Sequence, residues 1–420
     1  MTNSVKRSVP AQDFASKFNN TVESKIIMKT CKNILSFLVV LSLSLSVFTG
    51  CDSKPAEPSG TSEAEPKAMG LKDYYKDNFL IGAALYPELF DDPVAADLIK
   101  THFSAMTPEN DMKWALLHPT IGEYKFDRVD KIAEFTRANG IKLIGHTLVW
   151  HSQLGQGVFT KEGAADTNDL TDSETLFARI KDHIFTVAGR YKGKVFGWDV
   201  VNEALNEDGT YRESGFYKIA GDAFIEKAFE YAREADPGVE LYYNDYNLVK
   251  PEKRQGAIRI IKKLQEKGLR VDAVGIQAHW DLTFPELEEI EKSILEFSEL
   301  GIKVMFTELD VSVLPSPWGT PSADIGIRHE NSDNMNPYPD VLPDEAADAL
   351  AKRYKDIFAV FNKYRDKISR VTFWGLHDGI SWKNNFPIYG RTDYPLVFNR
   401  EMKPKKAYFE ITGLMEQEKK

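Results

Sequence analysis

Two glutamates stand at the ends of apolar runs, where their carboxylates could act on a bound molecule. Glu203 closes the run VFGWDVVNE, and Glu308 lies in the run FTELD. Each one alone has an ordinary interpretation, because strands that enter polar loops occur in every soluble protein. Two carboxylates that flank a glycosidic bond, however, are the catalytic pair of most glycoside hydrolases. Whether Glu203 and Glu308 form such a pair or are ordinary strand-end residues depends on whether the fold brings them together.

The segments around them alternate between apolar and amphipathic character. Short apolar runs with the composition of strands covered on both faces begin near residues 79, 103, 142, 194, 240, 273, 303 and 370. Amphipathic, charged segments between them predict helices, several of which end in Gly, for example at 127–140, 223–238 and 252–268. Eight βα units favour the α/β class and a closed (β/α)8 TIM barrel with a single catalytic domain; a doubly wound open sheet is the alternative.

Polar and aromatic side chains collect where these predicted strands end. Active sites of such barrels lie at the carboxyl ends of the strands. Carboxylates, amides and imidazoles can bind hydroxyl groups, and indole rings can bind the apolar faces of sugars. The candidate residues of these types, together with a lysine and a tyrosine, are Glu109, Asn110, Lys113, His146, Trp150, Asn202, Tyr246, Gln277, His279, Asp310, Trp374 and Trp382. The set predicts a carbohydrate cleft, with Trp280 and Trp318 left open between packing and sugar binding.

The composition excludes several other classes of function. The formal net charge is −10 without a basic block, which argues against a nucleic-acid partner. No glycine-rich phosphate-binding motif follows a predicted strand, so a nucleotide ligand has no support. The only cysteines are Cys31 and Cys51, and the eight histidines are scattered. We therefore expect no thiol nucleophile, metal or cofactor, and we expect a monomer.

The N-terminal segment predicts export and a lipid anchor. An apolar run at 34–48 follows Lys29 and Lys32 and has the length of a signal-peptide core, too short to span a bilayer comfortably. The sequence FTGC that ends at Cys51 resembles a bacterial lipoprotein signal, in which Cys51 becomes the lipidated first residue. A plain secretory signal is the alternative. We expect anchoring to a bacterial membrane, at the outer membrane or cell surface, or else a secreted or periplasmic protein.

Domain boundaries follow from these changes in composition. We expect Met28 to be the natural start, with 28–50 as the signal peptide; residues 1–27 are then an upstream extension, and the alternative is a long n-region that begins at Met1. Residues 51–70 are rich in Pro, Ser, Glu and Ala and predict a flexible tether. The catalytic barrel then spans 71–415.

Motifs at the strand ends give the sequence a family resemblance. Over about residues 71 to 415 it resembles the family 10 glycoside hydrolases, chiefly endo-β-1,4-xylanases, in the motifs TPENDMKW, GHTLVWHSQ, WDVVNEAL, YYNDYN, GIQAHW, FTELDV and FWGLHDGISW. The resemblance implies endo-acting, retaining hydrolysis of xylan and xylo-oligosaccharides, with Glu203 as general acid/base and Glu308 as nucleophile. It also implies that the sugar on the non-reducing side of the scissile bond is held by Glu109, Asn110, Lys113, His146, Trp150, Asn202, Gln277, His279, Trp374 and Trp382.

Chemistry adds expectations for individual side chains. The pKa of Glu203 must lie above the usual range if this residue is to donate a proton, whereas Glu308 must be ionised to attack carbon. His279 could bind Glu308, and Asp310 could orient that imidazole or else form only a loop salt bridge. Asn202 is placed to reach the sugar 2-hydroxyl. Tyr246 could stack beyond the cleavage point.

A long segment at 314–342, here called the long loop, follows the seventh predicted strand. It should lie on the same face as the site and shape one side of the cleft. Two other functions stay open at this stage. One is a related β-1,4-glucanase or mixed-linkage glucanase, and the other is a catalytically silent surface glycan-binding protein. The intact pair Glu203 and Glu308 counts against the silent protein.

Overall fold

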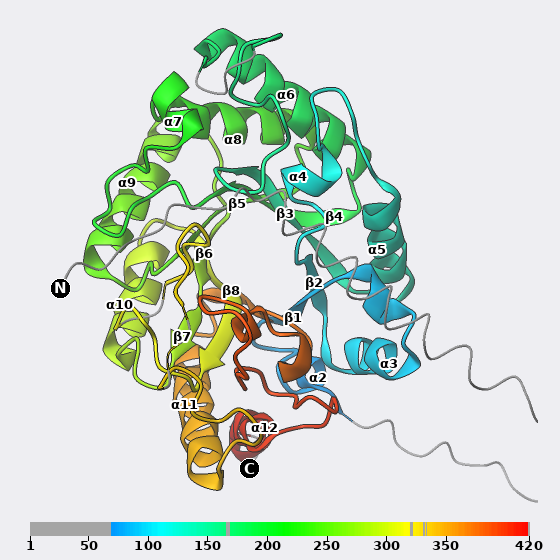
Figure 1. Cartoon of the computed structure of the whole chain (residues 1–420), viewed down its shortest axis with the longest axis vertical. Helices are drawn as coiled ribbons and strands as arrows, with labels where there is room; N and C mark the ends of the chain where they lie inside the picture. The colour runs from blue at the N-terminus through cyan, green and yellow to red at the C-terminus, as the bar shows by residue number, and fades with distance from the viewer. Residues whose placement is uncertain (1–68, 165–168, 320–321, 331, 333, 419–420) are drawn as a thin grey trace, which may run out of the picture. The chain divides into compact units, whose positions relative to one another are not determined.

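Eight parallel strands close into a barrel in the computed structural model, which describes residues 69–164, 169–319, 322–330, 332 and 334–418. Hydrogen-bonded neighbours follow the order β6-β5-β4-β3-β2-β1-β9-β8, and pairing of β6 with β8 closes the ring. The strands are β1 Leu80–Leu85, β2 Ala105–Pro108, β3 Lys142–Trp150, β4 Val195–Asn202, β5 Glu240–Tyr246, β6 Ala273–Gln277, β8 Lys303–Ser312 and β9 Ile368–Phe373. Helices surround these strands (Figure 1), which confirms the predicted TIM barrel.

The helices begin and end at residues suited to those positions. In α3, Asp92 accepts hydrogen bonds from two backbone N–H groups and Pro93 occupies the first turn, a common N-terminal arrangement. The longer helices are α3 Pro93–His102, α5 Asp127–Ala138, α6 Ser173–Arg190, α8 Ala223–Ala235, α9 Pro251–Glu266, α10 Leu287–Ser298, α11 Asp344–Lys363 and α12 Lys406–Glu418. Short helical turns are α2 Leu71–Tyr74, η1 Pro87–Phe90, α4 Trp114–Leu117, α7 Gly215–Ala220, η2 Asp378–Ile380 and η3 Trp382–Asn384. Among the helices of the described ranges, none combines the length and apolarity needed to cross a membrane.

Predicted helix ends and one predicted strand differ from the structure. Helices α5, α8 and α9 end two or three residues before the predicted limits of 140, 238 and 268, because the terminal residues, such as Gly140 at φ 64°, leave the helical conformation. The sixth apolar run is interrupted at Ala278, and a separate short strand, β7 His279–Asp281, pairs with β8. This pairing sets His279 opposite Asp310.

Two glycines make room for large side chains on the two sides of the barrel strands. A Cβ atom on Gly145 of β3 would lie 2.0 Å from Cε3 of Trp198, and one on Gly197 of β4 would lie 1.9 Å from the hydroxyl of Tyr242. Trp198 is fully buried. Trp198 packs in the layer between strands and helices, whereas Tyr242 packs with Ile144, Ala273 and Met305 inside the barrel.

The N-terminal predictions fall mostly outside the described residues. The extension 1–27, the signal peptide 28–50, the lipidated Cys51 and the tether up to residue 68 all lie outside the described ranges. Within them, Gly70 is buried, and its N–H donates to Oδ2 of Asp73 at 2.8 Å. Ordered packing thus begins one residue before the predicted domain boundary.

The contact between Gly145 and Trp198 predicts a stability effect. Gly145→Ala should lower the free energy of unfolding by roughly 1–3 kcal/mol, the usual result of overpacking a core. Urea unfolding followed by Trp fluorescence measures this change. The control is Gly413→Ala in α12, where a Cβ atom meets nothing within 4 Å and where Ala stabilises a helix by about 1 kcal/mol. Equal effects of the two substitutions would contradict the packing argument.

Candidate active site

The two glutamates lie at the carboxyl ends of β4 and β8. Glu203 follows the last residue of β4 and has φ 57°, a left-handed conformation that costs a residue with a side chain about 1–2 kcal/mol. Its backbone N–H donates to the carbonyl of Asn244 at 2.9 Å, which fixes this turn. Glu308 lies within β8, and both carboxylates are 5% exposed. The fold therefore places two buried carboxylates at one end of the barrel.

Neutral hydrogen-bond donors surround Glu203. Its Oε2 accepts from the indole N–H of Trp150 at 2.8 Å, and its Oε1 accepts from the amides of Gln277 at 3.1 Å and Asn202 at 3.2 Å. Burial raises the pKa of Glu203, and the charge of Glu308 raises it further, against the effect of these hydrogen bonds. The carboxyl group is therefore suited to hold a proton.

A charged imidazole distinguishes Glu308 from its partner. Its Oε2 lies 3.0 Å from Nε2 of His279, whose Nδ1 lies 3.0 Å from Oδ2 of Asp310, and its Oε1 accepts from Asn244 at 3.0 Å. Burial acts to raise the pKa of Glu308, but the hydrogen bond from His279, the charges of His146 and His279 and the bond from Asn244 lower it below the usual range. The expected Asp–His–Glu chain is present, and it favours an ionised Glu308.

Side-chain amides connect the two glutamates. Oδ1 of Asn202 accepts from Asn244 at 2.8 Å and from Gln277 at 3.1 Å, while Asn244 also donates to Glu308. Oδ1 of Asn244 accepts from the hydroxyl of Thr307 at 2.6 Å. Asn244 was not among the predicted site residues. Its place directly after the apolar run of β5 was the available signal.

The residues after β2 form a charged group beside Trp150. Nζ of Lys113 donates to Asn110 at 3.0 Å and lies 4.9 Å from the ring centre of Trp150. Burial lowers the pKa of Lys113, while the charges of Glu109 and of the two glutamates oppose this effect. Burial in turn raises the pKa of Glu109 against the charge of Lys113. These four predicted residues therefore lie together and next to the glutamates.

His146 is held by a carboxylate that the sequence analysis missed. Its Nδ1 lies 2.9 Å from Oδ2 of Asp199, and both side chains are buried. The ring of Trp374 stands edge-on to His146 at 5.5 Å and to His279 at 6.1 Å. Asp199 lies inside an apolar strand run, where a single carboxylate gives little signal in sequence.

The long loop reaches the Glu308 side of the site through a series of aromatic rings. Trp382 donates its indole N–H to Asp310 at 2.7 Å, and its ring lies 4.6 Å from that of His279. Phe386 stacks on Trp382 at 4.6 Å, and Trp318 of the long loop lies 5.8 Å from Phe386. The loop thus contacts the site's face, as expected. Trp318 serves at least as packing in this arrangement.

The other side of the site contains contacts that the sequence did not reveal. The hydroxyl of Tyr246 accepts a hydrogen bond from Nη2 of Arg212 at 2.8 Å, and Nη1 of Arg212 donates to Asp324 at 3.2 Å. Asp324 belongs to the long loop. Trp280, left open earlier, is fully buried with its ring 5.8 Å from that of Phe306, which indicates packing.

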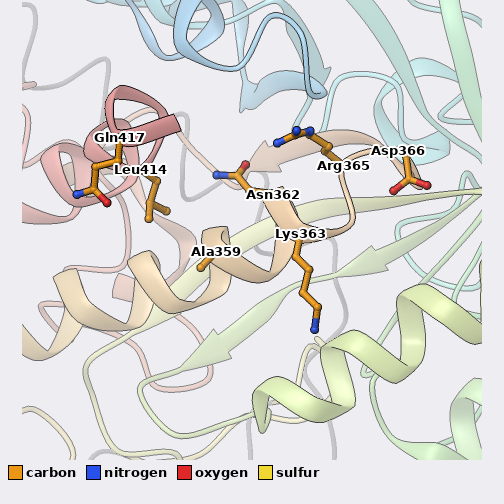
Figure 2. A pocket seen from close by; sticks show the side chains of 7 residues that line it. All are labelled: Ala359, Asn362, Lys363, Arg365, Asp366, Leu414 and Gln417. Carbon is orange, nitrogen blue, oxygen red and sulfur yellow. The ribbon is translucent and has the colours of Figure 1, made fainter. Parts of the chain in front are cut away.

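A separate recess lies away from the glutamates. Its volume is about 740 Å³, and it is lined by the end of α11, the residues after it and α12: Ala359, Asn362, Lys363, Arg365, Asp366, Leu414 and Gln417. Figure 2 shows that these side chains point in different directions. None of the predicted site residues lines it. Among the residues that the structure describes, no cluster of three or more His, Cys, Asp or Glu could hold a metal ion.

Comparison with known proteins gives consistent matches over this barrel. A family model described as glycosyl hydrolase family 10 matches residues 70–414. A beta-1,4-xylanase of Dictyoglomus thermophilum is 41% identical over 358 residues, which cover 84% of this chain and 94% of that protein.

Solved structures match the same region. One is a family 10 endoxylanase retrieved from sugarcane soil metagenome, with 44% identity and a TM-score of 0.79, over 82% of this chain and 100% of that chain. Another is a mutant in complex with xylotriose, with 37% identity and a TM-score of 0.73, over 82% and 99% of the two chains.

The contacts of Asp310 predict how His279 titrates. Burial acts to lower the pKa of His279, but the charge of Asp310 and the hydrogen bonds to Asp310 and Glu308 outweigh it and raise the pKa. Asp310→Asn should therefore let His279 lose its proton at a lower pH than in the wild type. It should also lower the free energy of unfolding by about 1–3 kcal/mol at neutral pH, because the new amide leaves a buried donor unsatisfied.

NMR of the labelled imidazole nitrogens across pH measures the first effect, and urea unfolding measures the second. The control is Asp130→Asn, which removes an exposed partner of Arg190 on the outer helices. An unchanged titration of His279 in Asp310→Asn would contradict the described coupling.

Proposed function

The chain belongs to glycosyl hydrolase family 10, and on this premise we propose that it is an endo-1,4-β-xylanase that hydrolyses xylan and xylo-oligosaccharides with retention of configuration. The observation that carries the proposal is the contrast between the two buried glutamates. The pKa of Glu203 is raised, chiefly by burial, and that of Glu308 is lowered by His279 and its other partners despite burial. A retaining glycosidase needs one protonated and one ionised carboxyl group.

The roles of the two glutamates follow from these states. Glu308 attacks the anomeric carbon while Glu203 gives its proton to the departing glycosidic oxygen, so that the bond breaks and a glycosyl-enzyme ester forms. Glu203, now ionised, removes a proton from water. The water oxygen attacks the same carbon, and the carboxylate of Glu308 leaves. Two inversions retain the configuration.

The dependence of the rate on pH follows from the same assignment. Activity is lost at low pH as Glu308 takes up a proton, and the lowered pKa of Glu308 moves this limb toward acid. Activity is lost at high pH as Glu203 gives up its proton, and the raised pKa of Glu203, due mainly to burial, moves this limb toward alkali. Because the groups interact, both limbs belong to the pair.

The contacts of several predicted binding residues support a sugar site beside the two glutamates. Asn202 donates to Glu203 and accepts from Asn244, whose amide also donates to Glu308. This position suits Asn202 to bind the 2-hydroxyl next to the anomeric carbon. Trp374 stands edge-on to both His146 and His279. We assign the sugar on the non-reducing side to these residues together with Glu109, Asn110, Lys113, Trp150, Gln277 and Trp382.

The anchor is a second part of the proposal, and it rests on the sequence alone. Lys29 and Lys32 precede the apolar run at 34–48, and the small residues Thr49 and Gly50 stand directly before Cys51. This pattern supports export and lipidation of Cys51. Residues 52–68 contain no large apolar side chain, so they could act as a tether between a membrane and the barrel.

Removal of either glutamate separates their roles. Glu203→Ala should lower the rate of xylan cleavage by roughly 10²–10⁴-fold, the usual contribution of a positioned acid and base. An aryl xylobioside with an acidic phenol should still form the glycosyl-enzyme, because its leaving group needs no proton, and should then stall, because no general base is left to activate water. Added azide should restore turnover and give a β-glycosyl azide. Burst kinetics and NMR of the product measure these outcomes.

Glu308→Ala is the matched variant, and it should lose activity on both substrates because no ester can form. If azide rescues it, the product should be the α-azide. Normal cleavage of xylan by Glu203→Ala, or an α-azide from that variant, would contradict the assignment. The wild type should release reducing sugars from xylan in preference to soluble cellulose derivatives.

The two cysteines of the chain provide a test of the anchor. In a bacterial host, the wild type and Cys31→Ala should partition into the membrane fraction, whereas Cys51→Ala should not, because only Cys51 receives lipid. Fractionation followed by immunoblotting measures the distribution. Equal solubility of all three proteins after export would mean that the segment is a plain secretory signal.

A further inference from the structure

A salt bridge connects the loops that follow the two strands bearing the glutamates. Arg212 lies between β4 and α7, and Asp324 lies in the long loop between β8 and α11. Nη1 of Arg212 and Oδ2 of Asp324 are 3.2 Å apart, and the side chains are 16% and 24% exposed. The bridge therefore reaches from the β8 side of the site to the β4 side.

Arg212 is also held by contacts that do not involve Asp324. Its Nη2 donates to the hydroxyl of Tyr246 at 2.8 Å, and its backbone N–H donates to the carbonyl of Ala204 at 2.8 Å. Ala204 directly follows Glu203. Tyr246 is 3% exposed at the end of β5. The first contact orients the guanidinium, and the second holds the backbone of Arg212 against the residue after Glu203, and neither depends on the charge of Asp324.

Several ionisable groups act on Glu203 from the surrounding elements. They are Lys113 after β2, Arg212 after β4, Tyr243, Asp245 and Tyr246 on β5, and Glu308 on β8. Of these, Lys113 donates to Asn110 and interacts with the charges of Glu109 and of both glutamates, so it does not act on Glu203 alone. Arg212 is the cation that forms a salt bridge with the long loop, at Asp324, and both of these charges also face His151 after β3.

We propose that Asp324 is a positioning residue that acts on Glu203 through Arg212, by offsetting part of the guanidinium charge beside the acid/base. This inference rests on the proposed role of Glu203. It gives the long loop a part in catalysis, because the loop supplies the anion that adjusts the proton donor. It also explains why a partly exposed salt bridge, which contributes little to stability at most surfaces, lies at this place.

The sign of each effect follows from the charges. A cation near Glu203 favours its ionised form. The charge of Arg212 accordingly lowers the pKa of Glu203, in opposition to burial, which is the largest influence and raises it. Removal of Arg212 should keep Glu203 protonated to higher pH. Removal of the charge of Asp324 leaves Arg212 uncompensated and should cause Glu203 to lose its proton at lower pH. The two halves of one salt bridge thus have opposite effects.

The experiment measures kcat/KM on a xylo-oligosaccharide across pH for Arg212→Met and Asp324→Asn in the full chain. The readout is the rate on the alkaline side of the optimum divided by the rate at the optimum. We expect this ratio to rise roughly threefold in Arg212→Met and to fall roughly threefold in Asp324→Asn, changes typical of one neighbouring charge. The double variant should lie between the two single variants.

Two further variants distinguish charge from loop structure. Asp324→Glu keeps the anion and should restore the wild-type ratio. Glu289→Gln breaks a salt bridge with Arg254 on the outer helices that has the same 3.2 Å distance and a similar exposure of 26% for the carboxylate side chain, and it should leave the profile unchanged. Thermal unfolding of each variant shows whether the protein is folded.

The outcomes separate this inference from the proposed function. If Glu203→Ala keeps the wild-type alkaline limb on the aryl xylobioside, the role of Glu203 is wrong. If that limb disappears, but Arg212→Met and Asp324→Asn change the ratio in the same direction or not at all, the role of Asp324 is wrong. Opposite changes, with rescue by Asp324→Glu, support it.

Discussion

Two carboxyl groups buried in one site must hold different numbers of protons, and most of the structure around them serves this requirement. Burial alone would raise the pKa of both glutamates. The protein separates them through the donors that each one meets. Glu308 receives a hydrogen bond from the imidazole of His279, whereas the side chains that donate to Glu203 are neutral, namely the indole of Trp150 and the amides of Gln277 and Asn202.

The barrel supplies these donors from different strands at fixed positions. Side chains such as Tyr242, admitted by Gly197, pack inside the barrel, and Trp198, admitted by Gly145, packs among the helices outside it, so the strand ends are held by a rigid scaffold. The break at Ala278 lets β7 pair with β8 and sets His279 opposite Asp310. An irregularity in one strand thereby creates the charged partner that Glu308 requires.

The sequence was sufficient to predict the strands, and also those contacts whose polar residues stand at the ends of predicted strands. It predicted the eight strands and the chain from Asp310 through His279 to Glu308. It missed Asn244 and Asp199, because each of these side chains contacts other side chains whose positions only the closed barrel defines. The pair of Arg212 and Asp324 is separated by 112 positions in the chain, and neither residue stands at a strand end. Loop–loop contacts of this kind have no local pattern.

Both glutamates have a cation near them and an anion beyond it, and the difference between the two arrangements explains their different chemistry. His279 contacts Glu308 directly at 3.0 Å, and the charge of Asp310 raises the pKa of that imidazole against the effect of burial. Arg212 instead directs its guanidinium at Tyr246 and Asp324 and acts on Glu203 through space. A direct charge-assisted hydrogen bond stabilises an anion more than a compensated charge at a distance does. The two arrangements therefore favour an ionised Glu308 and a protonated Glu203, as the roles proposed for them require.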